Sequence, residues 1–300
     1  MADAEPPADK GMTLGDHLDE LRTRLFRAVV VIVVCFGVAY AYRQDVTQIV
    51  LQPFENGVGM LNEHWPPYFD ELVRDDPALV RTDYFLSGDP TLDPTGLALV
   101  QELVISDKPM MTGTSEGFMM RLKASLYFAL FVGGPYLLWQ LWGFIGAGLY
   151  KSERRIVLSF FPASIVLFFC GVLFGYFSLV PYGIYYLNID EVPGVTIIQF
   201  RLQEYFAFIT SLCLALGVVF QLPILQTAVA KVGLVEPKTF IHYRGHFALT
   251  SFVIAAVLTP PDPVTQSMMA GPMIVLYEVG IICARMVAPK PLNLEEGNAA

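Results

Sequence analysis

Two glutamates lie beside arginines next to apolar runs of the chain, in the segments DHLDELRTRL and LYKSERR. Glu20 precedes Arg24 by one helical turn, and Glu153 is followed directly by two arginines. Ionised carboxylates at the edge of a membrane could bind cationic groups, because they accept charge-assisted, bidentate hydrogen bonds from guanidinium groups. Binding of a basic ligand is therefore one of two interpretations of these residues.

Each of these glutamates also has a purely structural explanation. Glu20 and Arg24 are spaced i,i+4 and could simply pair on one helix. Glu153 could follow Ser152 as the N-cap of a helix, because a carboxylate in the first turn suits the helix dipole. The residues alone leave both explanations open.

Three further polar groups lie within apolar runs, namely Glu278, Gln221 and Gln266. An ionised carboxylate near the bilayer centre costs about 2.5–3.5 kcal/mol on insertion scales, so we expect Glu278 to face protein or water. For the two glutamines, hydrogen bonds between helices are favoured over a direct functional role.

The sequence lacks the usual groups of a hydrolase or metalloenzyme. None of its four histidines has metal-ligand spacing with a cysteine or carboxylate, and no glycine-rich phosphate loop is present. The four cysteines fall inside apolar runs, where a thiol behaves as a small hydrophobic group. We therefore expect no enzymatic activity, cofactor, metal or nucleic-acid partner. The histidines are His17, His64, His242 and His246, and the cysteines are Cys35, Cys170, Cys213 and Cys283.

Composition indicates a membrane protein made of helices. Apolar residues make up 54% of the chain and charged residues 16%, and several apolar runs are long enough to span a bilayer. The interpretation is an all-α, polytopic integral membrane protein with six transmembrane helices, of which the fifth and sixth are short. The spans are expected at Ala28 to Tyr42, Ala124 to Trp142, Ile156 to Tyr182, Tyr205 to Ala230, Phe247 to Thr259 and Pro263 to Ala284.

The fifth apolar run is the shortest. At 1.5 Å per residue it reaches only about 20 Å, so it must lie under a thinned bilayer or form a re-entrant leg paired with the sixth. The first span is preceded by an amphipathic helix with leucines at helical spacing, which starts after a capping-box pattern at Thr13 and Asp16.

Lysines and arginines predict the orientation of the spans. They are abundant before the first span, between the second and third, before the fifth and after the sixth, and scarce in the alternate connections. Both termini should therefore be cytoplasmic. An alternative is that the first span is a cleaved signal peptide ending near the AYA at Ala39 to Ala41, which would leave five spans.

The connection between the first and second spans is long and acidic. Residues 43–118 form an enlarged periplasmic loop in this interpretation, and two strand-like runs around SGDPTLDPTG favour a small ordered β-hairpin within it. The remaining boundaries are a disordered cytoplasmic tail over 1–12, the membrane domain over 13–286 and a cytoplasmic tail over 287–300.

Four segments carry a family resemblance: HLDELRTRL, WGFIGAGLYKSERR, GVLFGYFSLVP and LTPPDPVTQ. In this order and spacing they resemble the signature segments of TatC, the six-span receptor of the twin-arginine translocation system. The resemblance covers nearly the whole chain. It implies a protein of the bacterial inner membrane that binds signal peptides with paired arginines. It also implies export of folded proteins with single-span TatA and TatB partners, driven by the proton-motive force, and a homo-oligomer in the receptor complex.

The resemblance also assigns roles to individual residues. Glu20 and Glu153 match the acids that receive the arginines of the signal peptide, with Arg22 and Phe144 close by in the same motifs. Positions expected to contact partners or to support function are Pro53, Tyr176, Gln221, Asp262, Gln266 and Glu278. At Gln221 the family often has glutamate, which puts any role that requires a charge there in doubt.

A proton-coupled secondary transporter is the alternative, suggested by Glu278 and the intramembrane glutamines. Transporters are often built from inverted repeats. No such repeat is visible, because the charged helix before the first span has no counterpart before the fourth.

Overall fold

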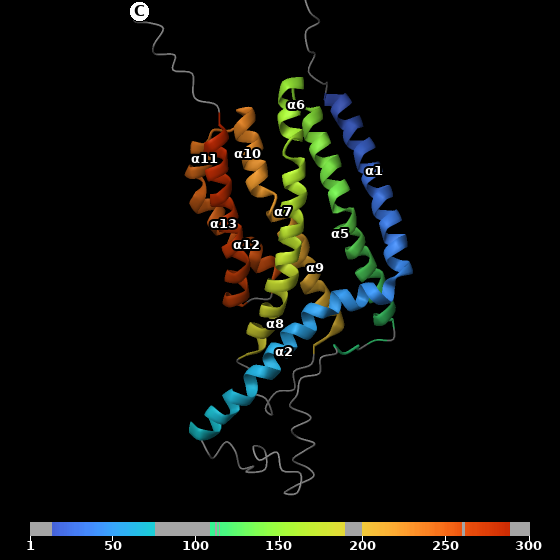
Figure 1. The fold of residues 1–300 in the computed structure, drawn as a ribbon, viewed down its shortest axis with the longest axis vertical. Helices are drawn as coiled ribbons and strands as arrows, with labels where there is room; N and C mark the ends of the chain where they lie inside the picture. Colours follow the sequence, from blue (N-terminus) through green and yellow to red (C-terminus); the bar gives the residue numbers. More distant parts are fainter. Residues whose placement is uncertain are drawn as a thin grey trace, which may run out of the picture.

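A computed structural model of the chain describes residues 14–75, 109–111, 113, 115–189, 200–259 and 262–288. The terminal tails, Thr13 of the expected capping box and the expected β-hairpin lie outside the described residues. The described residues form a bundle of helices (Figure 1).

Among the described residues, five helical passes are long and apolar enough to cross a membrane, and a sixth, shorter apolar helix lies between the last two of them. The first two passes are single helices, and the third and fourth are made of several consecutive helices. In chain order the elements are α1 (Leu14–Ala41), α2 (Arg43–Asp75), α5 (Glu116–Ala147), α6 (Lys151–Leu158), α7 (Phe161–Phe174), the π-helical turn η1 (Gly175–Leu179), α8 (Val180–Asn188), α9 (Leu202–Val219), α10 (Leu222–Val232), α11 (Pro237–His242), α12 (Arg244–Leu258) and α13 (Pro263–Val287).

The short fifth span is confirmed, since α12 has 15 residues and therefore a length of about 22 Å. The prediction of a short sixth span is wrong. α13 has 25 residues, because the helix continues through Arg285, a cation that suits the carboxyl end of a helix.

The fourth span is broken where α9 ends at Val219 and α10 begins at Leu222. Pro223 explains the break, because proline has no backbone N–H and its ring clashes with the preceding helical turn. Pro162 likewise lies at the start of α7, just after the bend that separates this helix from α6.

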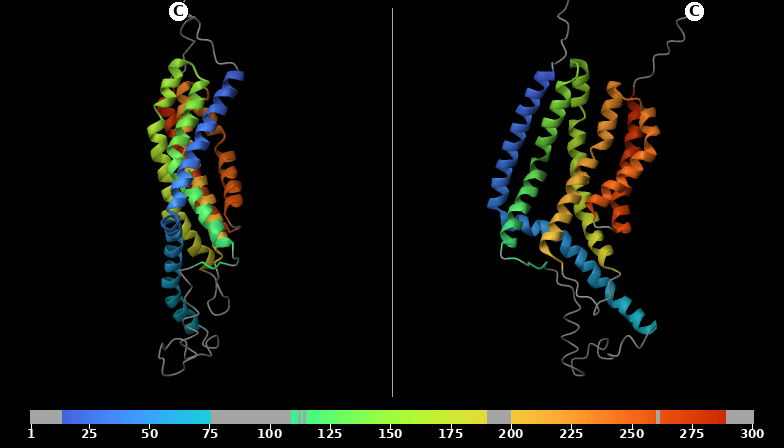
Figure 2. Two further views of the ribbon diagram at one scale, coloured as in Figure 1. Left: turned by 90° about the vertical axis from the view of Figure 1, so that its right-hand side faces the viewer. Right: turned by 180° about the vertical axis from the view of Figure 1, so that it is seen from behind.

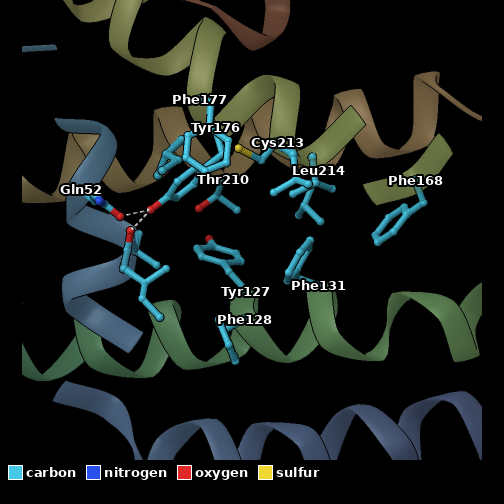
Figure 3. Close-up of a pocket in the computed structure, with 15 residues that line it drawn as sticks. Gln52, Tyr127, Phe128, Phe131, Phe168, Tyr176, Phe177, Thr210, Cys213 and Leu214 are labelled. Atoms are coloured by element: carbon cyan, nitrogen blue, oxygen red, sulfur yellow. Dashed lines mark hydrogen bonds between the residues drawn. The ribbon is translucent and has the colours of Figure 1, made fainter. Parts of the chain in front are cut away.

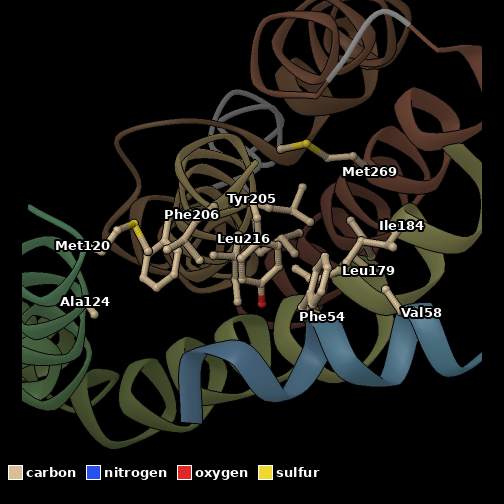
Figure 4. Close-up of a cluster of buried hydrophobic side chains, with 14 of the residues drawn as sticks. Phe54, Val58, Met120, Ala124, Leu179, Ile184, Tyr205, Phe206, Leu216 and Met269 are labelled. Carbon is tan, nitrogen blue, oxygen red and sulfur yellow. The ribbon is translucent and has the colours of Figure 1, made fainter. Parts of the chain in front are cut away.

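A helix that the sequence analysis did not expect, α2 (Arg43–Asp75), follows α1 directly. It lies across one end of the bundle and continues beyond it (Figures 1 and 2). Phe54 and Val58 of α2 are fully buried against Tyr205 of α9 and Ile184 of α8 (Figure 4). Gly57 permits this packing, because a Cβ there would lie 2.9 Å from the Pro181 carbonyl oxygen.

Different helices mark the two ends of the bundle. At the α6 end, α1 begins, α5 ends, α6 lies between α5 and α10, and α13 ends (Figure 1). At the α2 end, α1 ends, α2 crosses the bundle, and α5, α9 and α13 begin. Most of the outer face of α1 is apolar and exposed, as a helix that faces lipid should be.

Candidate functional site

The α6 end gathers residues that the sequence analysis assigned to one binding site. Glu20 lies in the second turn of α1, Phe144 in the last turn of α5 and Glu153 in the first turn of α6. These three helix ends meet at the same end of the bundle (Figures 1 and 2). Segments more than a hundred residues apart in the sequence therefore contribute to one rim.

Glu20 forms an ion pair with Arg24. Its Oε1 atom accepts from Arg24 Nε at 2.7 Å and lies 2.5 Å from Arg24 Nη2. Arg24 Nη1 also donates to Gln140 Oε1 of α5 at 3.4 Å. The i,i+4 pairing suggested by the sequence is thus present, but it uses one carboxylate oxygen and leaves Oε2 outside both bonds.

A stacked pair of rings joins α1 to α5 beside Glu20. His17 and Phe144 lie with their ring centroids 4.3 Å apart and an angle of 23° between the planes. His17 Nδ1 is buried and has no hydrogen-bond partner among the described residues. The sequence analysis considered His17 only as a metal ligand and missed this contact with Phe144. The available signal was the spacing of three residues between His17 and Glu20, which places both on one helix face.

Glu153 occupies the third position of α6, where its Oε2 atom accepts from the backbone N–H of Tyr150 at 3.2 Å. The N-cap of this helix is Tyr150 rather than Ser152 as expected, because α6 already begins at Lys151. A carboxylate has about four acceptor positions, so this single bond leaves most of its capacity unused. Arg22, the other residue assigned to this rim, is exposed to solvent.

Gln221 occupies the break between α9 and α10, and its side chain makes three hydrogen bonds. Its Oε1 accepts from Ser164 Oγ, and its Nε2 donates to the Ser164 carbonyl at 3.2 Å and the Gly217 carbonyl at 3.4 Å. Ser164 Oγ in turn accepts from Trp142 Nε1 at 2.9 Å. A neutral amide can donate and accept at once, so this network ties three spans together without a charge.

Gln221 also lines an apolar cavity of about 450 Å³ bounded by α5, α7, α9 and α10. Glu278 of α13 accepts from Arg244 Nη2 of α12 at 2.6 Å. Glu278 therefore contacts protein through a specific partner. The sequence analysis did not identify Arg244, because it lies 34 residues away in the sequence.

At the α2 end, Pro53 and Tyr176 are brought together by a backbone carbonyl. Pro53 has no N–H and cannot donate to the carbonyl of Ile49, its i−4 partner in α2. The Tyr176 hydroxyl donates to this carbonyl at 2.5 Å (Figure 3). The tyrosine thus replaces the missing helical hydrogen bond, and it lies at the edge of a second apolar cavity of about 330 Å³.

Asp262 and Gln266 stabilise the start of α13. Asp262 is its N-cap and accepts from the Thr265 N–H at 2.7 Å. Gln266 Nε2 donates to the Phe252 carbonyl of α12 at 2.9 Å, as expected of a glutamine that joins two helices. A further glutamine, Gln226 of α10, was not singled out from the sequence. It is 5% exposed, and its Oε1 has no partner within the described part of the chain.

No group of three or more histidine, cysteine, aspartate or glutamate side chains that could hold a metal ion occurs among the described residues. The chemistry of the α6 end is instead that of carboxylates and arginines at the rim of a membrane-spanning bundle. Fold and rim together define a multi-pass membrane protein.

Comparison with known proteins identifies the family. The family described as Sec-independent protein translocase protein (TatC) matches residues 16–272, a range that includes the first span. The chain belongs to the TatC family and is a component of the twin-arginine protein translocase. A TatC protein of Desulforapulum autotrophicum is 31% identical over 284 residues, covering 94% of this chain and 87% of the relative.

Two further similarities support this assignment. The TatC protein of Deinococcus radiodurans is 32% identical over 290 residues, covering 95% of this chain and 91% of its own length. A crystal structure of a twin arginine translocase receptor, TatC, superposes with a TM-score of 0.66 at 25% identity, covering 90% of this chain and 99% of that one.

Proposed function

We propose that this chain binds twin-arginine signal peptides at its α6 end and exports folded proteins together with TatA and TatB-like single-span partners, driven by the proton-motive force. Glu20 and Glu153 receive the two arginines, with Arg22 and Phe144 beside them. The observation that carries the proposal is that the helix ends with Glu20 and Glu153 lie at the same end of the bundle, and that each carboxylate has acceptor capacity that its internal bond leaves unused. The similarity to a TatC protein described as a twin arginine translocase receptor supports it.

The proposal places the α6 end in the cytoplasm of a bacterial inner membrane. α1 begins and α13 ends at this end, so the chain enters and leaves the bundle on the same side (Figure 1). Lysines and arginines gather in the flanks that reach this end, as the positive-inside rule requires of a cytoplasmic surface. Partner helices and further copies of the chain would assemble through the exposed apolar faces within the membrane. The residues that support the structure of the bundle at these faces are Pro53, Tyr176, Gln221, Asp262, Gln266 and Glu278.

The pairing of Glu278 weakens the transporter alternative. That alternative was motivated by an intramembrane carboxylate available for protons or solutes, whereas Glu278 is bound to Arg244 at 2.6 Å. The unused acceptors lie at the rim instead.

Peptide binding to the purified protein tests the proposal. A peptide with paired arginines should bind more tightly than one with paired lysines, and Glu20→Gln or Glu153→Gln should each weaken binding by about 1.5–3 kcal/mol, the value of a hydrogen bond to a charged group. Glu204→Gln is the matched control, since Glu204 is an exposed, paired glutamate at the α2 end. Unchanged affinity in both rim variants, or solute uptake by proteoliposomes without any preference for arginine, would refute the proposal.

A further inference from the structure

We propose that Arg24 is a positioning residue for Glu20, which it holds so that Oε2 meets an arginine of the peptide in a fixed direction. This inference rests on the proposed function and deepens it. It assigns the selectivity for arginine over lysine to a residue within the chain that is itself an arginine.

The geometry separates the two oxygens of the Glu20 carboxylate. Arg24 reaches Oε1 with both Nε and Nη2, at 2.7 Å and 2.5 Å, and directs Nη1 toward Gln140 of α5. All three guanidinium nitrogens therefore have acceptors, and the plane of the group is set by two helices. A carboxylate bound through one oxygen to such a fixed plane presents its other oxygen in a defined direction.

Burial makes this arrangement stiff. The Arg24 side chain is 15% exposed and that of Glu20 is 30% exposed, so the arginine is the more deeply buried partner. Removing one member of this partly buried pair would leave the other charge without its partner, which opposes exchange of Arg24 for an arginine of the peptide. The incoming arginine must therefore add to the pair.

Gly143 provides the space that the guanidinium occupies. A Cβ at this position would lie 2.1 Å from Arg24 Nη1 and 2.8 Å from Arg24 Cζ, closer than any real contact. Gly143 directly precedes Phe144, whose ring stacks on His17 one turn before Glu20. Two neighbouring residues of α5 thus support the turn of α1 that contains Glu20. Phe144 stacks on His17, and Gly143 leaves the space that the Arg24 guanidinium fills.

A fixed acceptor favours arginine for a physical reason. The donors of a guanidinium lie in one rigid plane and require an acceptor in the right direction, whereas the three donors of an ammonium rotate freely. An acceptor that is already ordered also avoids the entropy cost of immobilising a side chain on binding. Loss of Arg24 should therefore affect arginine peptides more than lysine peptides.

The sign of the effect separates positioning from charge. If Arg24 acted only through its charge, removing it would tighten binding, because it is a like charge beside a cationic peptide. Positioning predicts the opposite. Arg24→Gln should weaken binding of the paired-arginine peptide about tenfold and change binding of the paired-lysine peptide by less than about twofold, on the scale of a hydrogen bond to a charged group.

Gly143→Ala tests the same geometry with every charge retained, and it should reproduce the loss of Arg24→Gln. Gly133→Ala is the matched control in the same α1–α5 interface, because a Cβ there would meet Cys35 and Ile32 at ordinary distances of 4.0 Å. It should bind both peptides like the parent. In the Glu20→Gln background, Arg24→Gln should cause no further loss, because its target is already gone.

The outcomes distinguish this inference from the proposed function. A parent protein without preference for the paired-arginine peptide would refute the proposed function itself. A parent with that preference, whose Arg24→Gln and Gly143→Ala variants bind as tightly as it does or tighter, would overturn the positioning role alone. If Arg24→Gln proves unfolded by circular dichroism, Gly143→Ala and Arg24→Lys, which keep the charge, decide the question by the same two peptide affinities.

Discussion

The two ends of the bundle satisfy their polar groups by different means. At the α6 end, charged side chains form the contacts, with Glu20 bound to Arg24 and Glu153 bound to the Tyr150 N–H. The α2 end has an exposed ion pair of its own, Arg201 with Glu204, but the contacts that hold α2 come from neutral hydroxyls: Tyr176 donates to the Ile49 carbonyl at 2.5 Å and Tyr205 to the Val50 carbonyl at 2.6 Å.

This difference separates recognition from architecture. The Tyr176 and Tyr205 hydroxyls at the α2 end donate to consecutive carbonyls of α2. They therefore fix that helix on the third and fourth spans. The carboxylates at the α6 end keep unused acceptors on partly exposed side chains. Substitutions at the α6 end should therefore change peptide affinity more than stability, and substitutions at the α2 end should do the reverse.

The largest effect should come from reversing a charge at the α6 end. Glu153→Lys removes an acceptor and adds a repulsive cation, so binding of a paired-arginine peptide should weaken by about 3 kcal/mol or more. Isothermal titration of the purified variant measures this loss. A melting temperature like that of the parent confirms that recognition alone has changed, and a loss smaller than that of Glu153→Gln would contradict the direct contact.

Removing a hydroxyl at the α2 end should have the opposite signature. Tyr176→Phe leaves the Ile49 carbonyl without its donor, which should lower the free energy of unfolding by about 1–3 kcal/mol and leave peptide affinity unchanged. Pro53→Ala restores a backbone donor to the same carbonyl. Thermal unfolding of the double variant should therefore show a smaller loss than the sum of the single variants, and simple additivity would rule out the shared carbonyl.

Substitutions in the Gln221 network, which lies between the two ends, should change stability, as at the α2 end. In Gln221→Glu, an ionised carboxylate would face the carbonyls of Ser164 and Gly217, to which the amide now donates. We expect a loss of about 1–2 kcal/mol in unfolding free energy, on the scale of an unsatisfied buried group. Chemical denaturation in micelles provides the measurement, and a variant as stable as the parent would show that this position tolerates a charge.

The smallest effect should come from the cap of α13. Asp262→Ala removes the acceptor for the Thr265 N–H and should cost about 1 kcal/mol, whereas Asp262→Asn keeps a capping oxygen and should cost only a few tenths. Hydrogen exchange at the first turn of α13 should report the difference. Equal exchange in the two variants would mean that Asp262 matters through its charge.

The sequence predicted the spans well because lipid demands long apolar runs, and the short fifth span followed from length alone. It failed at α2, whose apolar residues are too sparse for a span and whose Pro53, Gly57 and Gly59 are typical of loops. This helix forms because Phe54 and Val58 are buried by distant spans, and tertiary packing overrides local propensity.

The site was predictable by residue and not by contact. The family motifs pointed to Glu20, Phe144 and Glu153, and the i,i+4 rule to Arg24, but no local rule places Gln140 on the guanidinium or Arg244 on Glu278. These partners lie 116 and 34 residues away, so only the packing of the helices brings them together. The same holds for the N-cap of α6, where the backbone turn selected Tyr150 over Ser152.

The most direct measurement of the central claim pairs each rim carboxylate with each peptide arginine. Affinities of the parent, Glu20→Gln and Glu153→Gln are measured for peptides with paired arginines and with either arginine changed to lysine. If each carboxylate receives one arginine, each variant should lose affinity for the paired-arginine peptide and lose little more when its own arginine is also removed. Strictly additive losses for every combination would contradict the claim and return Glu20 and Glu153 to the ion pair and the helix cap.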